Sequence, residues 1–172
     1  MKEIVVSGMR PTGRLHYGHY LGVIQNWISL QDKYDCYFFV ADWHALTTKY
    51  DSTESLRQNS LDVVIDWLAC GLDPDKCNIY VQSLIPEIAE LNIYLGMITP
   101  QNWVERDPCL KDMAKILKSK DGQGSQINYG LMGYPVLMSA DILMFNTDYI
   151  PVGIDQVAHI EITRDIARRF NN

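Results

Sequence analysis

The sequence lacks a long hydrophobic run, a signal-peptide pattern and an excess of basic residues. No apolar stretch approaches the roughly 18 residues that a membrane-spanning helix needs, and the N-terminus has no hydrophobic segment of the kind that secretion signals carry. The formal net charge is −6, which argues against a broad basic surface for nucleic acid. We therefore expect a soluble cytoplasmic protein without a membrane partner. Any nucleic acid would be held by a small region or by a part outside this sequence.

Cysteine is scarce and scattered. The four cysteines, Cys36, Cys70, Cys77 and Cys109, include no C-x-x-C pair, so the spacing of a zinc-binding or redox-active pair is absent. We expect reduced core thiols and no metal bound by the protein itself. Apolar residues make up 47% of the chain and charged residues 21%, which is ordinary for a globular domain that buries a core.

What the sequence does contain is a glycine, proline and threonine turn between an apolar strand and an amphipathic helix. The strand is expected over residues 3–7, and the helix repeats apolar residues at Leu21, Ile24 and Ile28. The free N–H groups at a helix start and the helix dipole favour phosphate. The turn therefore predicts a nucleoside triphosphate site.

Two histidines, His16 and His19, fall in the first turn of this helix. They are three residues apart, so both imidazoles project from one face. Gly18 between them adds no side chain, which lets a purine ring approach the backbone. The pair could instead bind a metal or only cap the helix, but zinc needs three or four ligands and no Cys or Glu flanks the pair at ligand spacing.

Strands and helices alternate along the rest of the chain. Further strands are expected over residues 37–41, 78–83 and 149–152, and further helices over 51–71, 86–97, 134–145 and 156–170. The helix over 51–71 is expected to have a capped start at 51–54. This alternation is typical of a doubly wound, Rossmann-like α/β fold with a parallel sheet and helices on both faces. We treat residues 1–172 as one such domain.

Polar side chains follow two of these strands, where parallel sheets bind their ligands. His44 follows the second strand and is either a pocket residue or a histidine packed beside Trp43. Asp155 and Gln156 follow a glycine turn. The aspartate suits ribose hydroxyls, and the glutamine suits an amine or a carboxylate.

Asp141 is the one carboxylate in an otherwise apolar helix over residues 134–145. A buried charge is costly unless it is paired or hydrogen-bonded. In one interpretation, Asp141 is satisfied without a ligand, by solvent or by a backbone amide. Alternatively, it accepts a hydrogen bond from a mostly apolar ligand, and Met138 lines the same pocket.

The segment 111–121 is rich in lysine and is either a solvated face or a lid over phosphates.

Four stretches together resemble class I aminoacyl-tRNA synthetases, and among them the bacterial tryptophanyl enzymes. They are residues 7–20, 40–47, 133–143 and 150–165. The resemblance covers most of the chain in the expected order. It implies activation of L-tryptophan with ATP and Mg²⁺, transfer to tRNA(Trp), and a homodimer.

The resemblance also implies roles for individual residues. The positions expected to bind ATP are Arg10, Pro11, Thr12, Gly18, His19, Gly153, Ile154 and Asp155. The positions expected to bind tryptophan are Gly8, His44, Tyr134, Met138, Asp141, Val152 and Gln156, with Asp141 reading the indole N–H. The expected catalytic groups are His16, His19 and Thr12, which would stabilise charge at the reacting phosphorus. Mg²⁺ would arrive with ATP.

The chain departs from the family's pattern in one respect. It has no Lys-Met-Ser-Lys-Ser loop and no anticodon-reading helical domain, and Lys118-Ser-Lys120 is only faintly similar and precedes the Asp141 helix. We expect an N-terminal fragment that binds substrate but catalyses weakly or not at all. The alternatives are a tyrosyl-tRNA synthetase, a small adenylyltransferase with the same His-x-Gly-His turn, and a non-catalytic ligand-binding fragment.

Overall fold

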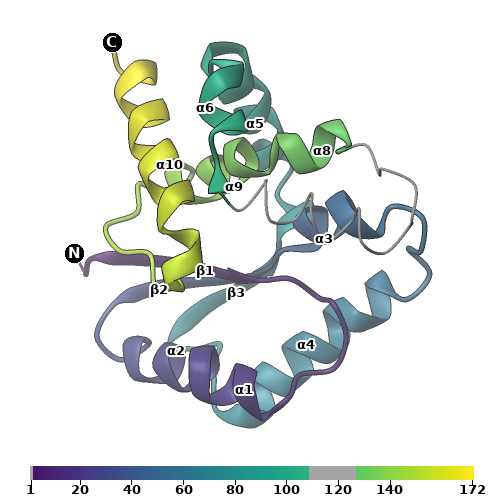
Figure 1. Ribbon diagram of the computed structural model, residues 1–172. Coiled ribbons are helices and arrows are strands. Elements are labelled where there is room, and N and C mark those ends of the chain that lie inside the picture. Colours follow the sequence, from purple (N-terminus) through teal and green to yellow (C-terminus); the bar gives the residue numbers. More distant parts are fainter. Residues whose placement is uncertain (1, 109–126) are drawn as a thin grey trace. The chain divides into compact units, whose positions relative to one another are not determined.

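The computed structural model describes residues 2–108 and 127–172 (Figure 1). The chain divides into two compact units. The first unit comprises Met1–Pro86 and Phe145–Pro151, and the second comprises Glu87–Met144 and Val152–Asn172. The lysine-rich segment 111–121, including Lys118-Ser-Lys120, lies outside the described residues.

A three-stranded parallel sheet forms the centre of the first unit. The strands β1 (Ile4–Met9), β2 (Asp35–Val40) and β3 (Cys77–Val81) pair in the order β1-β2-β3. Val6 pairs with Tyr37, and Phe38 pairs with Ile79. Parallel strands are covered on both faces, which explains why β1 and β2 are nearly continuous runs of apolar residues. The expected α/β fold with a parallel sheet is confirmed.

Helices cover one face of this sheet in Figure 1. They are α1 (Tyr17–His19), the π-helical turn η1 (Tyr20–Ile24), α2 (Gln25–Leu30) and α4 (Leu56–Cys70). Trp27 of α2 stacks on Phe38 of β2, with ring centroids 4.5 Å apart, and meets the edge of Trp67 of α4 at 5.1 Å. All three side chains are fully buried. Aromatic contacts of this kind add to the stabilisation from area burial and fix both helices to the sheet.

The cysteines in this core match the expectation of reduced thiols. Cys36 and Cys77 are buried neighbours on β2 and β3, Cys70 is half-buried, and all three are free. Burial, followed by the nearby Cys77 and Asp35, raises the pKa of Cys36 to about 11. The Cys36 thiol is therefore protonated at neutral pH. Cys109 lies outside the described residues.

Phe39 dominates the opposite face of the sheet. Its ring stacks on Tyr80, with centroids 5.4 Å apart, and its edge lies over Gly8 of β1. A Cβ atom at Gly8 would come within 2.4 Å of the ring. Only glycine at this position leaves room for the tip of the Phe39 ring against β1.

Gly8→Ala should destabilise the first unit. The added methyl group would meet three Phe39 ring atoms at 2.4–2.7 Å, and overpacking of this kind typically costs about 1–3 kcal/mol. Urea denaturation should show an earlier midpoint. Gly22→Ala is the matched control, because nothing lies within 4 Å of a Cβ there. Equal midpoints for the two variants would show that Phe39 has another position open to it.

Residues 42–49 form a helix that the sequence did not predict, α3 (Asp42–Lys49). Asp42 Oδ1 accepts hydrogen bonds from the amides of Trp43 and Ser83, each at 3.1 Å. Ser83 belongs to η2 (Gln82–Leu84), a 3₁₀ turn that directly follows β3. One carboxylate thus joins the ends of β2 and β3 and starts α3.

The prediction of a strand over residues 149–152 is wrong. In the described part of the chain, this segment makes a single parallel bridge, between Val5 and Tyr149. Pro151 follows and has no N–H with which to extend a ladder. Ser7 Oγ donates to the Pro151 carbonyl at 3.3 Å instead.

The expected start of α4 is also wrong, although its end is confirmed. The helix begins at Leu56, and Ser55 before it makes no side-chain cap. Gly71 ends the helix with φ of 111°, in the left-handed region that glycine adopts without strain.

The second unit is helical throughout its described part. Its elements are α5 (Pro86–Ile98), which starts at the unit boundary, α6 (Gln101–Glu105), α8 (Tyr129–Met132), α9 (Tyr134–Leu143), η3 (Ile154–Gln156) and α10 (Val157–Phe170). α9 and α10 meet where Ser139 Oγ lies 2.9 Å from Thr163 Oγ1. Across residues 2–108 and 127–172, no helix has the length and apolar character needed to span a bilayer.

Candidate active site

The predicted site residues are divided between the two units. The first unit holds Gly8, Arg10, Pro11, Thr12, His16, Gly18, His19 and His44, and the second holds Tyr134, Met138, Asp141, Val152, Gly153, Ile154, Asp155 and Gln156. Each unit thus carries its own set of polar groups.

His16 and His19 cap the start of α1 through their ring nitrogens. His16 Nδ1 accepts from the Gly18 amide at 3.1 Å, and His19 Nδ1 accepts from the His16 amide at 3.3 Å. A neutral imidazole that accepts at Nδ1 carries its proton on Nε2. Both side chains are therefore held as Nε2–H donors. The capping also means that two of the amides expected to be open for phosphate are already bonded.

The two imidazoles also influence one another. Their ring centroids are 3.9 Å apart. Partial burial, and then the proximity of His16, lower the pKa of His19 below its ordinary value. A neutral His19 keeps its Nδ1 free to accept the capping hydrogen bond. Gly18 makes room for this arrangement, because a Cβ there would lie 3.0 Å from Cε1 of His16.

The turn before the histidines is tied to α3. Arg10 donates to the hydroxyl of Thr48, and Lys49 Nζ donates to the Thr12 carbonyl at 3.2 Å. Arg10 Nε is buried and makes no hydrogen bond within the described residues. An unpaired buried donor costs free energy, and on a guanidinium an anion is the natural acceptor. Pro11 beside it is buried, whereas the Thr12 side chain is exposed.

Asp141 lies in the middle of α9 and is only 1% exposed. The solvent-facing alternative for this carboxylate is therefore wrong. Met138, one helical turn earlier, is half-buried. In the first unit, His44 of α3 is likewise buried, at 3% exposed, beside the half-buried Trp43.

The glycine turn in the second unit carries a chain of hydrogen bonds. Gln156 Nε2 donates to Asp155 Oδ2 at 2.6 Å, and Gln156 Oε1 lies 2.8 Å from His159 Nδ1. His159 Nε2 lies 2.6 Å from Asp107 Oδ2. A Cβ at Gly153 would come within 2.5 Å of Asp155 Oδ1, so glycine there leaves room for the carboxylate. Val152 and Ile154 flank this turn and are exposed.

The sequence patterns did not single out two members of this hydrogen-bonded series, His159 and Asp107. His159 lies in one of the stretches that resemble the synthetases, three residues after Gln156, and that helical spacing was an available signal. Asp107 falls where the sequence pattern weakens. The structure also brings Tyr134 to the same place, because its ring centroid lies 5.4 Å from that of His159.

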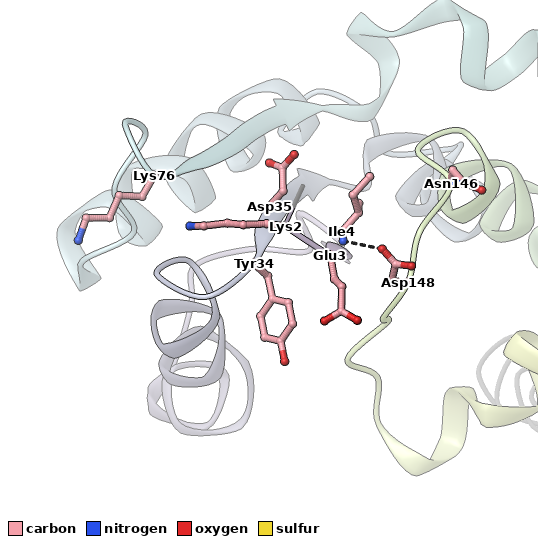
Figure 2. A pocket seen from close by; sticks show the side chains of 8 residues that line it. All are labelled: Lys2, Glu3, Ile4, Tyr34, Asp35, Lys76, Asn146 and Asp148. Carbon is pink, nitrogen blue, oxygen red and sulfur yellow. Dashed lines mark hydrogen bonds between the residues drawn. The ribbon is translucent and has the colours of Figure 1, made fainter.

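A separate pocket of about 480 Å³ opens at the amino ends of β1 and β2 (Figure 2). It is lined by Lys2, Glu3, Ile4, Tyr34, Asp35, Lys76, Asn146 and Asp148. No predicted site residue lines it. Several of its polar groups are bonded within the protein: the Ile4 amide donates to Asp148 at 2.8 Å, and Lys76 pairs with Asp32 at 2.9 Å. Parallel sheets bind ligands at the carboxyl ends of their strands, so this pocket is not the candidate site.

Comparison with known proteins places the chain in a family. The family model described as tRNA synthetases class I (W and Y) matches residues 2–172. The tryptophan–tRNA ligase of Ralstonia nicotianae is 53% identical over 169 residues, which cover 98% of this chain and 41% of that protein. That of Thermotoga maritima is 49% identical, with 97% and 50% covered. The chain spans about half the length of the curated relatives it matches.

Solved structures agree with this placement. A tryptophanyl-tRNA synthetase from Campylobacter jejuni, complexed with ADP and tryptophan, superposes with a TM-score of 0.89 at 41% identity, covering 98% of this chain and 50% of that one. A tyrosyl-tRNA synthetase from Archaeoglobus fulgidus shares the fold, with a TM-score of 0.80 at 21% identity. These matches confirm the resemblance seen in the sequence, and the chain belongs to the class I tRNA synthetase family of the tryptophan (W) and tyrosine (Y) enzymes.

Proposed function

We propose that this chain is the substrate-binding part of a cytoplasmic, homodimeric enzyme that activates L-tryptophan with ATP and passes it to tRNA(Trp). The observation that carries the proposal is the identity of about half of its residues, over nearly its whole length, with proteins named tryptophan–tRNA ligases. The parts of those proteins that the chain does not span would contribute to tRNA binding.

In the activation step, a carboxylate oxygen of tryptophan attacks the α-phosphorus of ATP. A phosphorus–oxygen bond forms as the bond from the α-phosphorus to the bridging oxygen breaks, and pyrophosphate leaves with the electron pair. The products are tryptophanyl-adenylate and pyrophosphate. Such a reaction asks the protein mainly to position the two reactants and to stabilise charge on the phosphates.

The first unit would hold the phosphates. Arg10, Thr12 and the Nε2–H groups of His16 and His19 are donors suited to phosphate oxygens, and the unpaired Nε of Arg10 supports an anion there. Pro11 and Gly18 would shape the turn. In the second unit, Gly153, Ile154 and Asp155 would contact the adenosine, with the aspartate accepting ribose hydroxyls.

Magnesium would be bound mainly by ATP. No group of three or more potential metal ligands occurs in the part of the chain that the structure describes. Mg²⁺ commonly keeps several waters and binds substrate phosphates, and it would arrive with the nucleotide. When bound, it would offset negative charge on the phosphates.

Tryptophan would be recognised by one buried acceptor in an apolar setting. Asp141 would accept the indole N–H, and Tyr134 and Gln156 would hold the ammonium group. In the second unit we assign Met138 and Val152 to the same pocket, and in the first unit we assign Gly8 and His44 to tryptophan from the resemblance alone. The burial of Asp141 in an apolar helix supports the proposal, because a desolvated acceptor discriminates strongly against ligands that leave it unpaired.

Single-turnover adenylate formation tests the proposal. Enzyme in excess over labelled ATP should convert it slowly to tryptophanyl-adenylate when tryptophan is present, and pyrophosphate should appear in equal amount. A preference for tyrosine would support the tyrosyl alternative. Nucleotide turnover that no amino acid affects would contradict amino-acid activation, and no product with either amino acid would leave only a binding function.

A further inference from the structure

The hydrogen-bonded chain Asp107–His159–Gln156–Asp155 contains two residues to which the proposed function gives no role. Asp107 and His159 are each 2% exposed, and they contact each other at 2.6 Å, although 52 positions separate them in the sequence. All four residues belong to the second unit.

The partners of Gln156 determine which way its amide faces. A carboxylate only accepts hydrogen bonds, so the Gln156 group that faces Asp155 is the NH₂ group. The amide oxygen therefore faces His159. An oxygen facing Nδ1 requires that Nδ1 carry a proton and donate it.

The other ring nitrogen of His159 is held as well. Nε2 lies 2.6 Å from Asp107 Oδ2, and both side chains are buried. This contact fixes the orientation of the imidazole, so that Nδ1–H points at the Gln156 oxygen. Removing one partner of a buried pair of this kind is strongly destabilising.

We propose that Asp107 and His159 are positioning residues for the amino acid, an inference that rests on the proposed function. Asp107 holds the His159 ring in place, and His159 locks the Gln156 amide in one orientation. One lone pair of Oε1 and one N–H of Nε2 remain available on that amide. The lone pair matches the ammonium of an α-amino acid, and the N–H matches its carboxylate. The Tyr134 ring lies 5.4 Å from the imidazole.

Calorimetric titration of tryptophan and of ATP into variants of the chain tests this inference. Asp107→Asn should raise the Kd for tryptophan about tenfold, the equivalent of one hydrogen bond, and change the Kd for ATP far less. Glu161→Gln is the matched control, because Glu161 lies on α10 in an exposed pair with Arg164. The double variant Asp107→Leu with His159→Leu removes both buried partners together, which is often tolerated. It should keep a cooperative thermal transition and still bind tryptophan weakly.

Nitrogen-15 spectra of the wild-type imidazoles give a second readout, which does not depend on how a variant folds. Nδ1 of His159 should show the protonated signature, because it donates to the Gln156 oxygen. A lone-pair signature at Nδ1 would overturn the inference, as would a double variant that folds and binds tryptophan as tightly as Glu161→Gln. Failure of the wild-type chain to bind tryptophan would instead count against the proposed function.

Discussion

Asp141→Asn is expected to weaken tryptophan binding about 10- to 100-fold while ATP binding changes little. The wild-type carboxylate is 1% exposed and would accept the indole N–H as a charged, desolvated acceptor. Hydrogen bonds to charged groups contribute about 1.5–3 kcal/mol, which corresponds to this range of affinity. The neutral amide is a weaker acceptor and can also present its NH₂ group to the indole.

Separate titrations of tryptophan and of ATP into each variant measure the two affinities. Asp165→Asn is the control, because Asp165 is a half-exposed carboxylate paired with Arg168 on α10. Phenylalanine, which has no N–H at that place, should bind the wild-type chain far more weakly than tryptophan. If Asp141→Asn lost both ligands equally, the carboxylate would have a structural role instead.

His19→Ala is expected to slow adenylate formation about 100-fold with little change in tryptophan affinity. The Nε2–H of His19 would donate to a phosphate oxygen as charge develops, and loss of one such donor typically costs about 10²–10³ in rate. His19 also caps α1 through Nδ1, and loss of a cap costs about 0.5–2 kcal/mol of stability. The two effects must be separated.

His19→Gln separates them, because glutamine at the third helical position can accept from the His16 amide as in a capping box but has no imidazole Nε2–H. It should retain the thermal stability of the wild-type chain and still lose most of the rate. Single-turnover kinetics at saturating tryptophan and ATP measure the step directly. A wild-type rate in His19→Ala would remove this residue from the mechanism.

The sequence predicted the elements whose patterns are local. Alternation of apolar runs and helical repeats placed β1, β2 and β3 within a few residues of their observed bounds. It failed for residues 149–152, where Pro151 limits pairing to one bridge, and for α3, whose first residue, Asp42, accepts a hydrogen bond from the distant Ser83 amide. α4 carries apolar residues around much of its circumference, so the exposure of Leu61 and Ile65 could not be read from the sequence.

In the candidate site, too, local sequence patterns predicted some features and could not predict others. The pairing of His16 with His19 follows from helical spacing and is observed. Their capping bonds depend on side-chain rotation, which spacing does not specify. The contact between Asp107 and His159 joins α10 to a residue 52 positions earlier, and no periodic pattern in one sequence encodes such a contact.

The central claim is that the chain recognises tryptophan, and calorimetric titration of L-tryptophan and L-tyrosine into the 172-residue chain tests it most directly. We expect one tryptophan bound per chain, with tyrosine at least about 100-fold weaker because it cannot donate an indole N–H to Asp141. Equal affinity for the two amino acids, or ATP binding with no measurable binding of tryptophan, would contradict it.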